Sequence, residues 1–209
     1  MKLRALTLTT AALFLTGCAD WFSGRHYDRT EPGELKGRLV VEWVSQDNFL
    51  FVPDPQNPLT FRRKNNEVIQ PEGMYTDGGS MPAALRAIKS YSPWGYAPAF
   101  IVHDWLFVMQ HCKVPGYENF DLDKAATIMA EAMKTLMENP KYGGPNKLVH
   151  YSMYEAVRSK AAADHWENGK CDTPTGPRSV AGPATARSQR PMTAAVPSDE
   201  ERPRFVIEF

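Results

Sequence analysis

The hydrophobic pattern of this 209-residue chain changes near residue 80, from short alternating runs to helical periodicity. From residue 35, short β-branched or aromatic runs are separated by Asn, Asp, Pro and Gly; they read GRLVVEWV, NFLFVPD, LTFRRKN and EVIQPEG. Such runs are typical of short strands joined by turns, and they predict a small antiparallel meander. Strands and helices in separate blocks indicate an α+β fold rather than alternating α/β.

After Ser80 we expect helices over residues 82–90, 97–111, 121–138 and 145–165. Stretches rich in Pro and Gly separate them, namely SPWGY, KVPGYEN and NPKYGGPN. The predicted fold is therefore a small N-terminal antiparallel β meander followed by a three- to four-helix core. Residues 35–170 are enough for one ordinary α+β domain.

The chain begins MKLRALTLTTAALFLTGC, in which a basic start precedes an apolar run too short to span a membrane. This arrangement is typical of an export signal. The final LTGC matches the bacterial lipobox, and that resemblance implies cleavage before Cys18 and acylation of Cys18. An ordinary signal whose cysteine is accidental is the alternative. We therefore predict a signal peptide over residues 1–17 and a lipidated polar tether over residues 18–34. Two or three acyl chains make membrane anchoring durable.

Ala19, rather than aspartate, follows Cys18. In the resemblance to enterobacterial lipoproteins this favours the outer membrane, so we expect a lipid-anchored envelope protein that faces the periplasm. Loss of Lys2 and Arg4 with the signal leaves 22 of 24 basic residues against 24 acidic ones. A chain this close to neutral offers no case for a nucleic-acid partner.

Besides the acylated Cys18, the mature chain has two cysteines, Cys112 and Cys171. Export to an oxidising compartment favours a disulfide between them over a metal site, and two unpaired thiols are the alternative. Residues 171–209 read as a mostly disordered tail, because residues 172–203 are rich in Pro, Ala, Ser, Thr and Arg. The terminal RFVIEF is β-prone and could join a sheet edge in this chain or in an envelope partner; a frayed terminus is the favoured alternative.

The stretch YTDGGSMP joins the last predicted strand to the first predicted helix. Gly78 and Gly79 permit a tight turn, and Ser80 is well placed to cap the helix. A strand, a turn and a capped helix explain these residues without any function. The functional alternative is that Asp77, with carbonyls of the glycine turn, forms part of an oxygen-rich cation site.

The stretch APAFIVHDWLFVM is a predicted apolar helix with two titratable residues, His103 and Asp104. Adjacent residues on a helix do not face one another, so we expect each to have its own partner. Any carboxylate that orients His103 must then come from another helix, with Asp121 and Asp123 the nearest candidates in sequence. The alternative is a satisfied core histidine beside a buried acceptor for a loop, since a buried carboxylate is costly unless it is paired.

Taken together, YTDGGSMP, YAPAFIVHDWLF and MAEAMKTL resemble the domain-of-unknown-function family 1353, known from bacteria and their phages. Members of this family carry a TDG-S-P turn, a YAPA…HD-Leu-Tyr helix and an acidic helix. The resemblance covers roughly residues 60–160. It implies membership, and no established activity comes with it.

A more remote resemblance is to the core helices of secreted calcium phospholipases, in which a glycine-rich turn precedes a His-Asp helix and a later helix supplies another aspartate. It implies His103 as general base, Asp104 and Asp77 as calcium ligands, and Asp123 as the residue that orients His103. The glycine loop here lacks the cysteine and tyrosine pattern of those enzymes.

Two classes of function follow. The favoured one is a lipid-anchored envelope protein with a non-enzymatic interaction or scaffold role, bound to the membrane through Cys18 and to an envelope protein through the C-terminal tail. The alternative is a metal-assisted hydrolase of membrane or envelope esters or amides, phospholipase-like, with calcium as its cofactor and His103 as its base.

Overall fold

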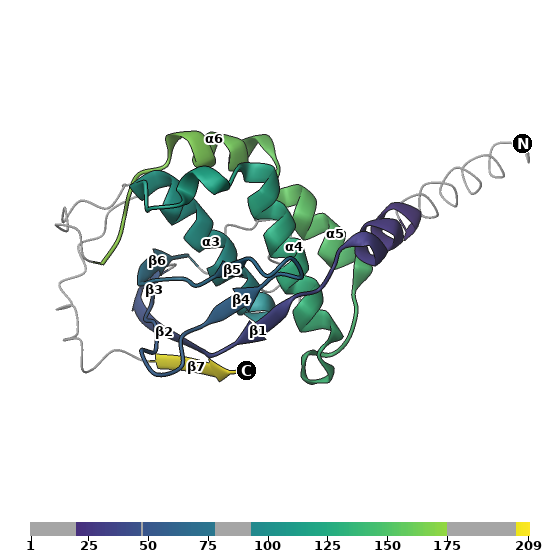
Figure 1. The fold of residues 1–209 in the computed structure, drawn as a ribbon, viewed down its shortest axis with the longest axis horizontal. Helices are drawn as coiled ribbons and strands as arrows, with labels where there is room; N and C mark the ends of the chain where they lie inside the picture. The colour runs from purple at the N-terminus through teal and green to yellow at the C-terminus, as the bar shows by residue number, and fades with distance from the viewer. Residues whose placement is uncertain (1–19, 47, 78–92, 175–203) are drawn as a thin grey trace, which may run out of the picture.

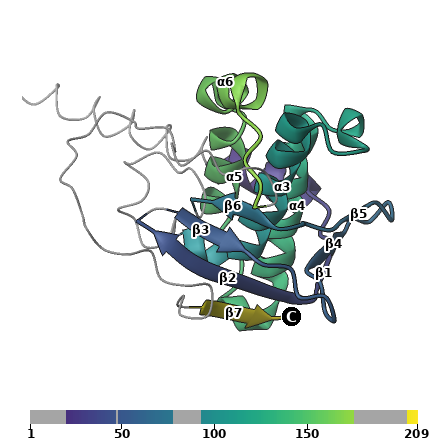
Figure 2. The same ribbon diagram turned by 90° about the vertical axis from the view of Figure 1, so that its left-hand side faces the viewer.

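The computed structural model describes residues 20–46, 48–77, 93–174 and 204–209. After a helix of residues 20–29, antiparallel strands precede the remaining helices along the chain, and one further strand lies at the C-terminus. In Figures 1 and 2 the strands lie along one side of the helices. The predicted α+β class is therefore confirmed.

The described strands form two antiparallel sheets rather than one meander, with strand orders β1-β4-β5 and β6-β3-β2-β7. Their bounds are β1 Glu34–Lys36, β2 Arg38–Ser45, β3 Asn48–Phe51, β4 Thr60–Arg62, β5 Val68–Ile69, β6 Met74–Thr76 and β7 Arg204–Glu208. Gly37 lies between β1 and β2 with φ of 100°, and a Cβ there would meet the carbonyl of Pro58. Glycine is therefore required where the chain passes from one sheet to the other.

The described helical elements that follow β6 are η2 Pro93–Tyr96, α3 Ala97–Cys112, η3 Tyr117–Asn119, α4 Leu122–Glu138, η4 Pro140–Tyr142, α5 Lys147–Ala156 and α6 Lys160–Asn168. The single helix predicted over 145–165 is wrong, because the chain breaks between α5 and α6. Ser159 ends the break by accepting a hydrogen bond from the backbone N–H of Ala162, which caps α6. The helix predicted over 82–90 lies outside the described residues.

Both sheets contribute to one hydrophobic core. Phe51 of β3 and Phe61 of β4 are completely buried, although they belong to different sheets. Helix α3 contacts α4, α6 and β6, and α4 also contacts α5 and β1. Leu106 of α3 and Met133 of α4 are completely buried in this core. The two central helices are thus held between the strands and the remaining helices.

Residues 20–29, assigned above to the tether, form a helix that packs on the domain. Tyr27 is 4% exposed, and the Lys134 ammonium of α4 donates hydrogen bonds to the carbonyls of Tyr27 at 2.9 Å and Thr30 at 2.8 Å. These bonds satisfy carbonyls at the C-terminal end of the helix, which would otherwise lack partners. The folded domain therefore includes residues that precede its first strand.

The C-terminal segment joins a sheet edge within this chain. Strand β7 pairs antiparallel with β2, with Arg38 opposite Glu208 and Glu42 opposite Arg204 (Figure 2). The Arg204 guanidinium also donates to the nearly buried carboxylate of Glu42 at 2.8 Å. The frayed terminus favoured above is therefore wrong. Residues 175–203, where disorder is predicted, lie outside the described residues.

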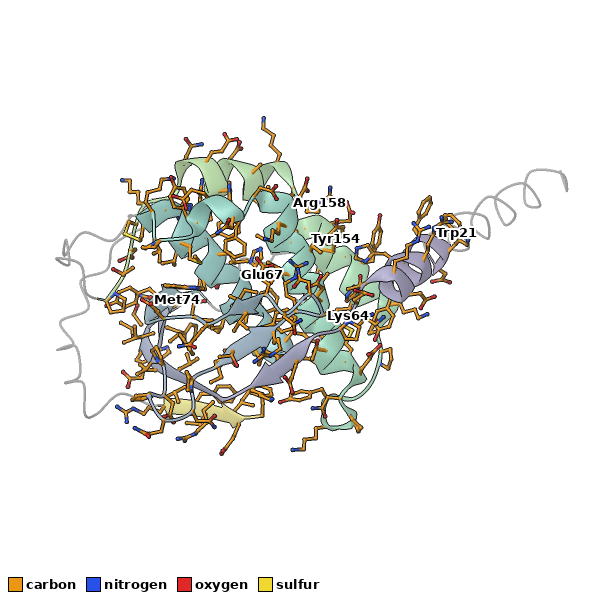
Figure 3. All side chains as sticks on the ribbon, in the orientation of Figure 1. Trp21, Lys64, Glu67, Met74, Tyr154 and Arg158 are labelled. Atoms are coloured by element: carbon orange, nitrogen blue, oxygen red, sulfur yellow. A yellow bond between two sulfur atoms is a disulfide. The ribbon has the colours of Figure 1, made fainter. Side chains whose placement is uncertain are left out.

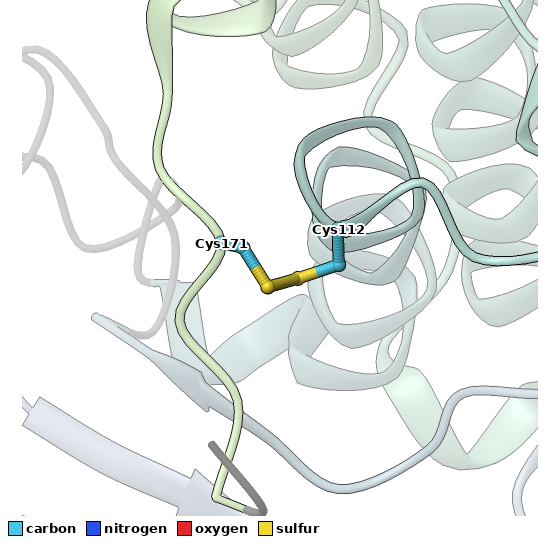
Figure 4. The surroundings of a disulfide bond; sticks show 2 residues. All are labelled: Cys112 and Cys171. Atoms are coloured by element: carbon cyan, nitrogen blue, oxygen red, sulfur yellow. A yellow bond between two sulfur atoms is a disulfide. The ribbon is translucent and has the colours of Figure 1, made fainter. Parts of the chain in front are cut away.

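Cys112 and Cys171 form a disulfide with an S–S distance of 2.08 Å (Figure 4). The bond joins the last residue of α3 to the segment after α6, across a sequence separation of 59. Of the two alternatives above, a disulfide or two free thiols, the structure has the disulfide. In the described part of the chain, no helix combines the length and the apolar character that crossing a membrane requires.

Candidate functional site

Helix α3 buries almost its whole length. Its buried residues include Phe100, Val102, His103 and Trp105. Of the two polar residues of the APAFIVHDWLFVM stretch, His103 is therefore buried, while Asp104 is only partly buried. Pro98 stands in the first turn, where its missing N–H costs no helical hydrogen bond. The apolar sequence explains why the helix is central, but it does not explain the His-Asp couple.

Asp104 has a specific structural partner. The Thr76 hydroxyl donates a hydrogen bond of 2.7 Å to Oδ2 of Asp104. Thr76 is the last residue of β6 and is 6% exposed, so the bond connects the end of the strand to the middle of α3. A hydrogen bond to a charged acceptor is stronger than a neutral one. Sequence reasoning did not single out Thr76, although it belongs to the quoted YTDGGSMP motif.

The side chain of His103 lies closer to Asp104 than helix geometry led us to expect. Nδ1 of His103 is 3.6 Å from Oδ1 of Asp104, which is ion-pair range but longer than a hydrogen bond. On a helix the Cα–Cβ bonds of adjacent residues point in different directions. The side-chain torsions of His103 and Asp104 nevertheless bring their polar atoms closer together. Nε2 of His103 is buried and has no hydrogen-bond partner among the described residues.

The structure does not bring Asp123 to His103. Asp123 lies in the first turn of α4 with a side chain that is 73% exposed, and its Oδ1 accepts a hydrogen bond of 2.8 Å from Nε of Arg158. Asp121, the other candidate, accepts from the backbone N–H of Lys124 and caps α4. Both carboxylates therefore have other partners at the exposed start of α4.

The two predicted calcium ligands come from neighbouring places in the fold. Asp77 is exposed and directly follows Thr76, which is bonded to Asp104. Residues 78–80 of the glycine turn lie outside the described residues. No group of three or more His, Cys, Asp or Glu side chains in the described ranges could hold a metal ion. Calcium takes about six to eight oxygen ligands, so the described residues by themselves do not make a calcium site.

The acidic residue of the third motif belongs to a salt-bridge network. Nε and Nη2 of Arg63 donate to the two carboxylate oxygens of Glu131 at 2.6 and 2.7 Å, and Nη1 donates to Glu67 at 2.6 Å. The Glu131 carboxylate is the main cause of a raised pKa at Arg63. Lys124 of α4 also donates to Glu67, labelled in Figure 3. The network fastens the loop between β4 and β5 to α4.

Rings surround the other side of His103. The His103 ring lies 5.0 Å from Phe107, and Phe107 contacts His165 at 5.4 Å and Trp166 at 4.8 Å. One turn further along α3, Nε2 of His111 lies 2.9 Å from the carbonyl of His165, and burial lowers the pKa of His111. This contact joins α3 to α6 beside the disulfide. The sequence gives no signal for it, since α3 and α6 are far apart along the chain.

A groove lies elsewhere, between the helix of residues 20–29 and helices α4 and α5. Its volume is about 690 Å³. None of its lining residues comes from α3, so it is separate from His103 and Asp104. Aromatic residues contribute much of its wall, namely Trp21, Phe22, Tyr151 and Tyr154. Figure 3 shows Trp21 at the outer end of the helix and Tyr154 on α5.

A family model described as a protein of unknown function (DUF1353) matches residues 56–161, just over half of the chain. The chain belongs to this family. The DUF1353 match contains the Thr76–Asp104 bond, His103 and the Arg63–Glu131 pair, while the helix of residues 20–29 and strand β7 lie outside it. No curated protein and no solved structure matches the chain. The likeness to secreted phospholipase helices therefore stays a prediction.

Proposed function

We propose that the chain is a lipid-anchored bacterial envelope protein whose DUF1353 domain has an interaction or scaffold role. One observation supports the interaction or scaffold role over an enzymatic one. The acidic side chains of the second and third motifs are used to join elements of the fold, Asp104 with Thr76 and Glu131 with Arg63. Both bonds connect a helix to the strand region, so these residues serve the architecture.

The anchoring part rests on the LTGC stretch and its apolar leader. Acylation of Cys18 would hold the protein in the outer membrane with its domain in the periplasm, where an oxidising environment suits the Cys112–Cys171 disulfide. Acidic and basic residues are equal in number in the whole chain, so its net charge gives no argument for a nucleic-acid partner.

Metabolic labelling tests the anchor. The full chain, expressed with its leader in bacteria given an alkyne-bearing palmitate, should incorporate the label and sediment with the outer membrane. Cys18→Ser should lose the label and leave the membrane fraction. Incorporation of equal label by Cys18→Ser would show that Cys18 is not the lipidation site.

The interaction role is tested by photo-crosslinking in the envelope. Strand β7 is part of the fold, so removal of the whole tail would damage the domain. Residues 175–203 are therefore replaced by a Gly/Ser segment of equal length, which leaves β7 able to reach β2. We expect the replacement to abolish crosslinks to a discrete envelope protein. Unchanged crosslinks would exclude this segment as the partner's site.

A metal-assisted hydrolase is the second candidate, and one observation favours it. His103 has a buried Nε2 without a hydrogen-bond partner among the described residues, and its Nδ1 lies 3.6 Å from a carboxylate oxygen of Asp104. An imidazole beside a carboxylate is a common general base. Turnover of a phospholipid ester, with calcium or with chelator, is compared between the native chain and His103→Asn. Equal turnover by both would remove His103 from any catalytic role.

A further inference from the structure

Two large aromatic residues are exposed side by side in the helix of residues 20–29. Trp21 is 56% exposed and Phe22 is 52% exposed, and their rings meet edge to face at 4.9 Å. Figure 3 shows Trp21 on the part of this helix that projects furthest from the sheets. Adjacent exposed aromatic residues are unusual on a water-facing surface and are typical of a contact with another apolar phase.

The helix that carries this pair is fixed to the domain. The Lys134 ammonium is 7% exposed and bonds to the carbonyls of Tyr27 and Thr30. The backbone N–H of Gly33 donates to the Thr135 hydroxyl at 2.8 Å, which holds the chain just after the helix. The position of Trp21 and Phe22 relative to the rest of the fold is therefore set by buried bonds.

The predicted acylation site lies very close to the aromatic pair. Cys18 precedes Trp21 by three residues. Since consecutive Cα atoms are 3.8 Å apart, the two Cα atoms are separated by at most about 11 Å. A cysteine whose acyl chains enter a bilayer lies at the level of the lipid headgroups, so Trp21 must lie in or beside the same layer. Trp is enriched at that depth in membrane proteins, where its ring suits a half-polar environment.

Charge near the pair suits an anionic lipid surface. The Arg25 guanidinium lies 5.1 Å from the centre of the Trp21 ring, one turn further along the helix. The acidic residues later in this region have cationic partners, since Asp28 bonds to Lys147 and Glu31 to Lys64. The negative charge of Asp20 opposes the attraction of Arg25 to anionic lipids. Burial of the two aromatic rings therefore supplies the larger part of the free energy of membrane binding.

We propose that the face of this helix with Trp21, Phe22 and Arg25 inserts into the headgroup region of the anionic bilayer that holds Cys18. The proposal rests on the lipid anchor of the proposed function. It means that the domain lies against the membrane in one orientation instead of moving on a flexible tether. Strands β2 and β3, at the opposite end of the molecule in Figure 1, then face the periplasm.

Fluorescence quenching by brominated lipids tests this contact. The full chain is purified from membranes, and mass spectrometry of its N-terminal peptide reports whether Cys18 carries lipid. The protein is then placed in vesicles of phosphatidylethanolamine and phosphatidylglycerol, with and without bromine on the acyl chains. The chain has five tryptophans, so the contribution of Trp21 is isolated by comparison with Trp21→Phe. We expect Trp21→Phe to lower the quenched fraction about twofold, since Trp anchors lie within reach of the acyl chains.

Trp43→Phe is the matched control, because Trp43 is also exposed, at 45%, but lies on β2. Its quenching should equal that of the native chain. If Cys18 carries lipid and Trp21→Phe is quenched as strongly as the native chain, the membrane contact is excluded while the anchor stands. If Cys18 carries no lipid, the proposed anchor fails and the contact that rests on it fails as well.

Discussion

His150 is a buried histidine that the fold keeps neutral. Its ring is completely buried, and Nε2 lies 2.9 Å from the carbonyl of Ala130 in α4. Burial is the main cause that lowers the pKa of His150 from 6.5 to about 4. Protonation would place a charge among the rings of His26 and Tyr27, which lie 5.2 and 5.0 Å away.

The stability of the native state should therefore fall as the pH drops from 6.5 towards 4, because the unfolded state binds a proton that folded His150 refuses. We expect the free energy of unfolding to decrease by about 2 kcal/mol between pH 7 and pH 5. His150→Gln keeps a donor for Ala130 but does not titrate, and it should show a smaller decrease. Urea unfolding at both pH values measures the difference. His26 and His111, whose pKa values are also lowered, give both proteins some remaining pH dependence. An equal decrease in both proteins would contradict the claim that His150 causes the loss of stability.

A second prediction concerns the energetic coupling between Thr76 and Asp104, which share a hydrogen bond. Asp104→Ala and Thr76→Val should each destabilise the fold, and together they should cost less than their sum. We expect a coupling energy of about 1.5 kcal/mol, since the acceptor is charged and Thr76 is buried. Denaturant unfolding of the four proteins gives this value. The exposed Asp123–Arg158 pair is the control and should couple by about 0.5 kcal/mol or less. Additive effects at Asp104 and Thr76 would show that their bond does not brace the strand.

At the scale of elements, α4 organises the molecule. One face packs into the core, while Glu131 binds the loop between β4 and β5 and Lys134 holds the helix of residues 20–29. The two polar residues are nearly buried, at 9% and 7% exposure, and each has partners that compensate for the loss of water. The helical period of MAEAMKTL predicts the helix, but the partners of its charged residues come from distant segments.

Lys134→Met should release the N-terminal helix from the domain. The substitution keeps the aliphatic part of the side chain but leaves the carbonyls of Tyr27 and Thr30 without their donor. We expect the attachment of the helix to weaken by about 2 kcal/mol or more, with faster amide exchange in residues 20–29 than in α3. Hydrogen exchange with mass spectrometry measures the exchange rates of the two segments.

Lys147→Met is the matched control for this experiment. Lys147 bonds to Asp28 of the same helix, but both side chains are well exposed. An exposed ion pair contributes little to stability, so exchange in residues 20–29 should change much less. Equal effects of the two substitutions would mean that burial of the Lys134 bonds is not what holds the helix.

At the scale of the whole molecule, two long-range links close the chain upon itself. Strand β7 returns to β2, and the disulfide ties the end of α3 to the segment after α6. Gly169 lies where a Cβ would clash with the His111 ring, so this segment approaches α3 closely just before Cys171. In the described residues after α6, the chain is thereby attached to the domain through Cys171 and through β7.

Removal of the disulfide should lower the free energy of unfolding by up to about 4 kcal/mol, because the bond constrains a loop with a sequence separation of 59 in the unfolded chain. The oxidised native chain is compared with the Cys112→Ala, Cys171→Ala double variant by urea unfolding. Added reductant should destabilise the native chain and leave the double variant unchanged. The same midpoint for native and double variant would show that the bond contributes no stability.

The fold class and the succession of strands and then helices between residues 35 and 138 follow from the sequence alone, because hydrophobic period and turn residues act over a few neighbouring positions. Helix α4 is recognisable in this way, as are the motifs that carry family membership. The same local argument failed across 145–165, where apolar spacing continues through a break that Ser159 caps.

Tertiary structure alone decided which residues meet. Asp123 could have oriented His103 by sequence distance, but the packing of α4 turns it outward to Arg158. Lys134 reaches Tyr27 across a sequence separation of 107, and this contact converts a predicted tether into a fixed helix. No local pattern encodes such contacts, since they depend on how whole elements pack and not on neighbouring residues.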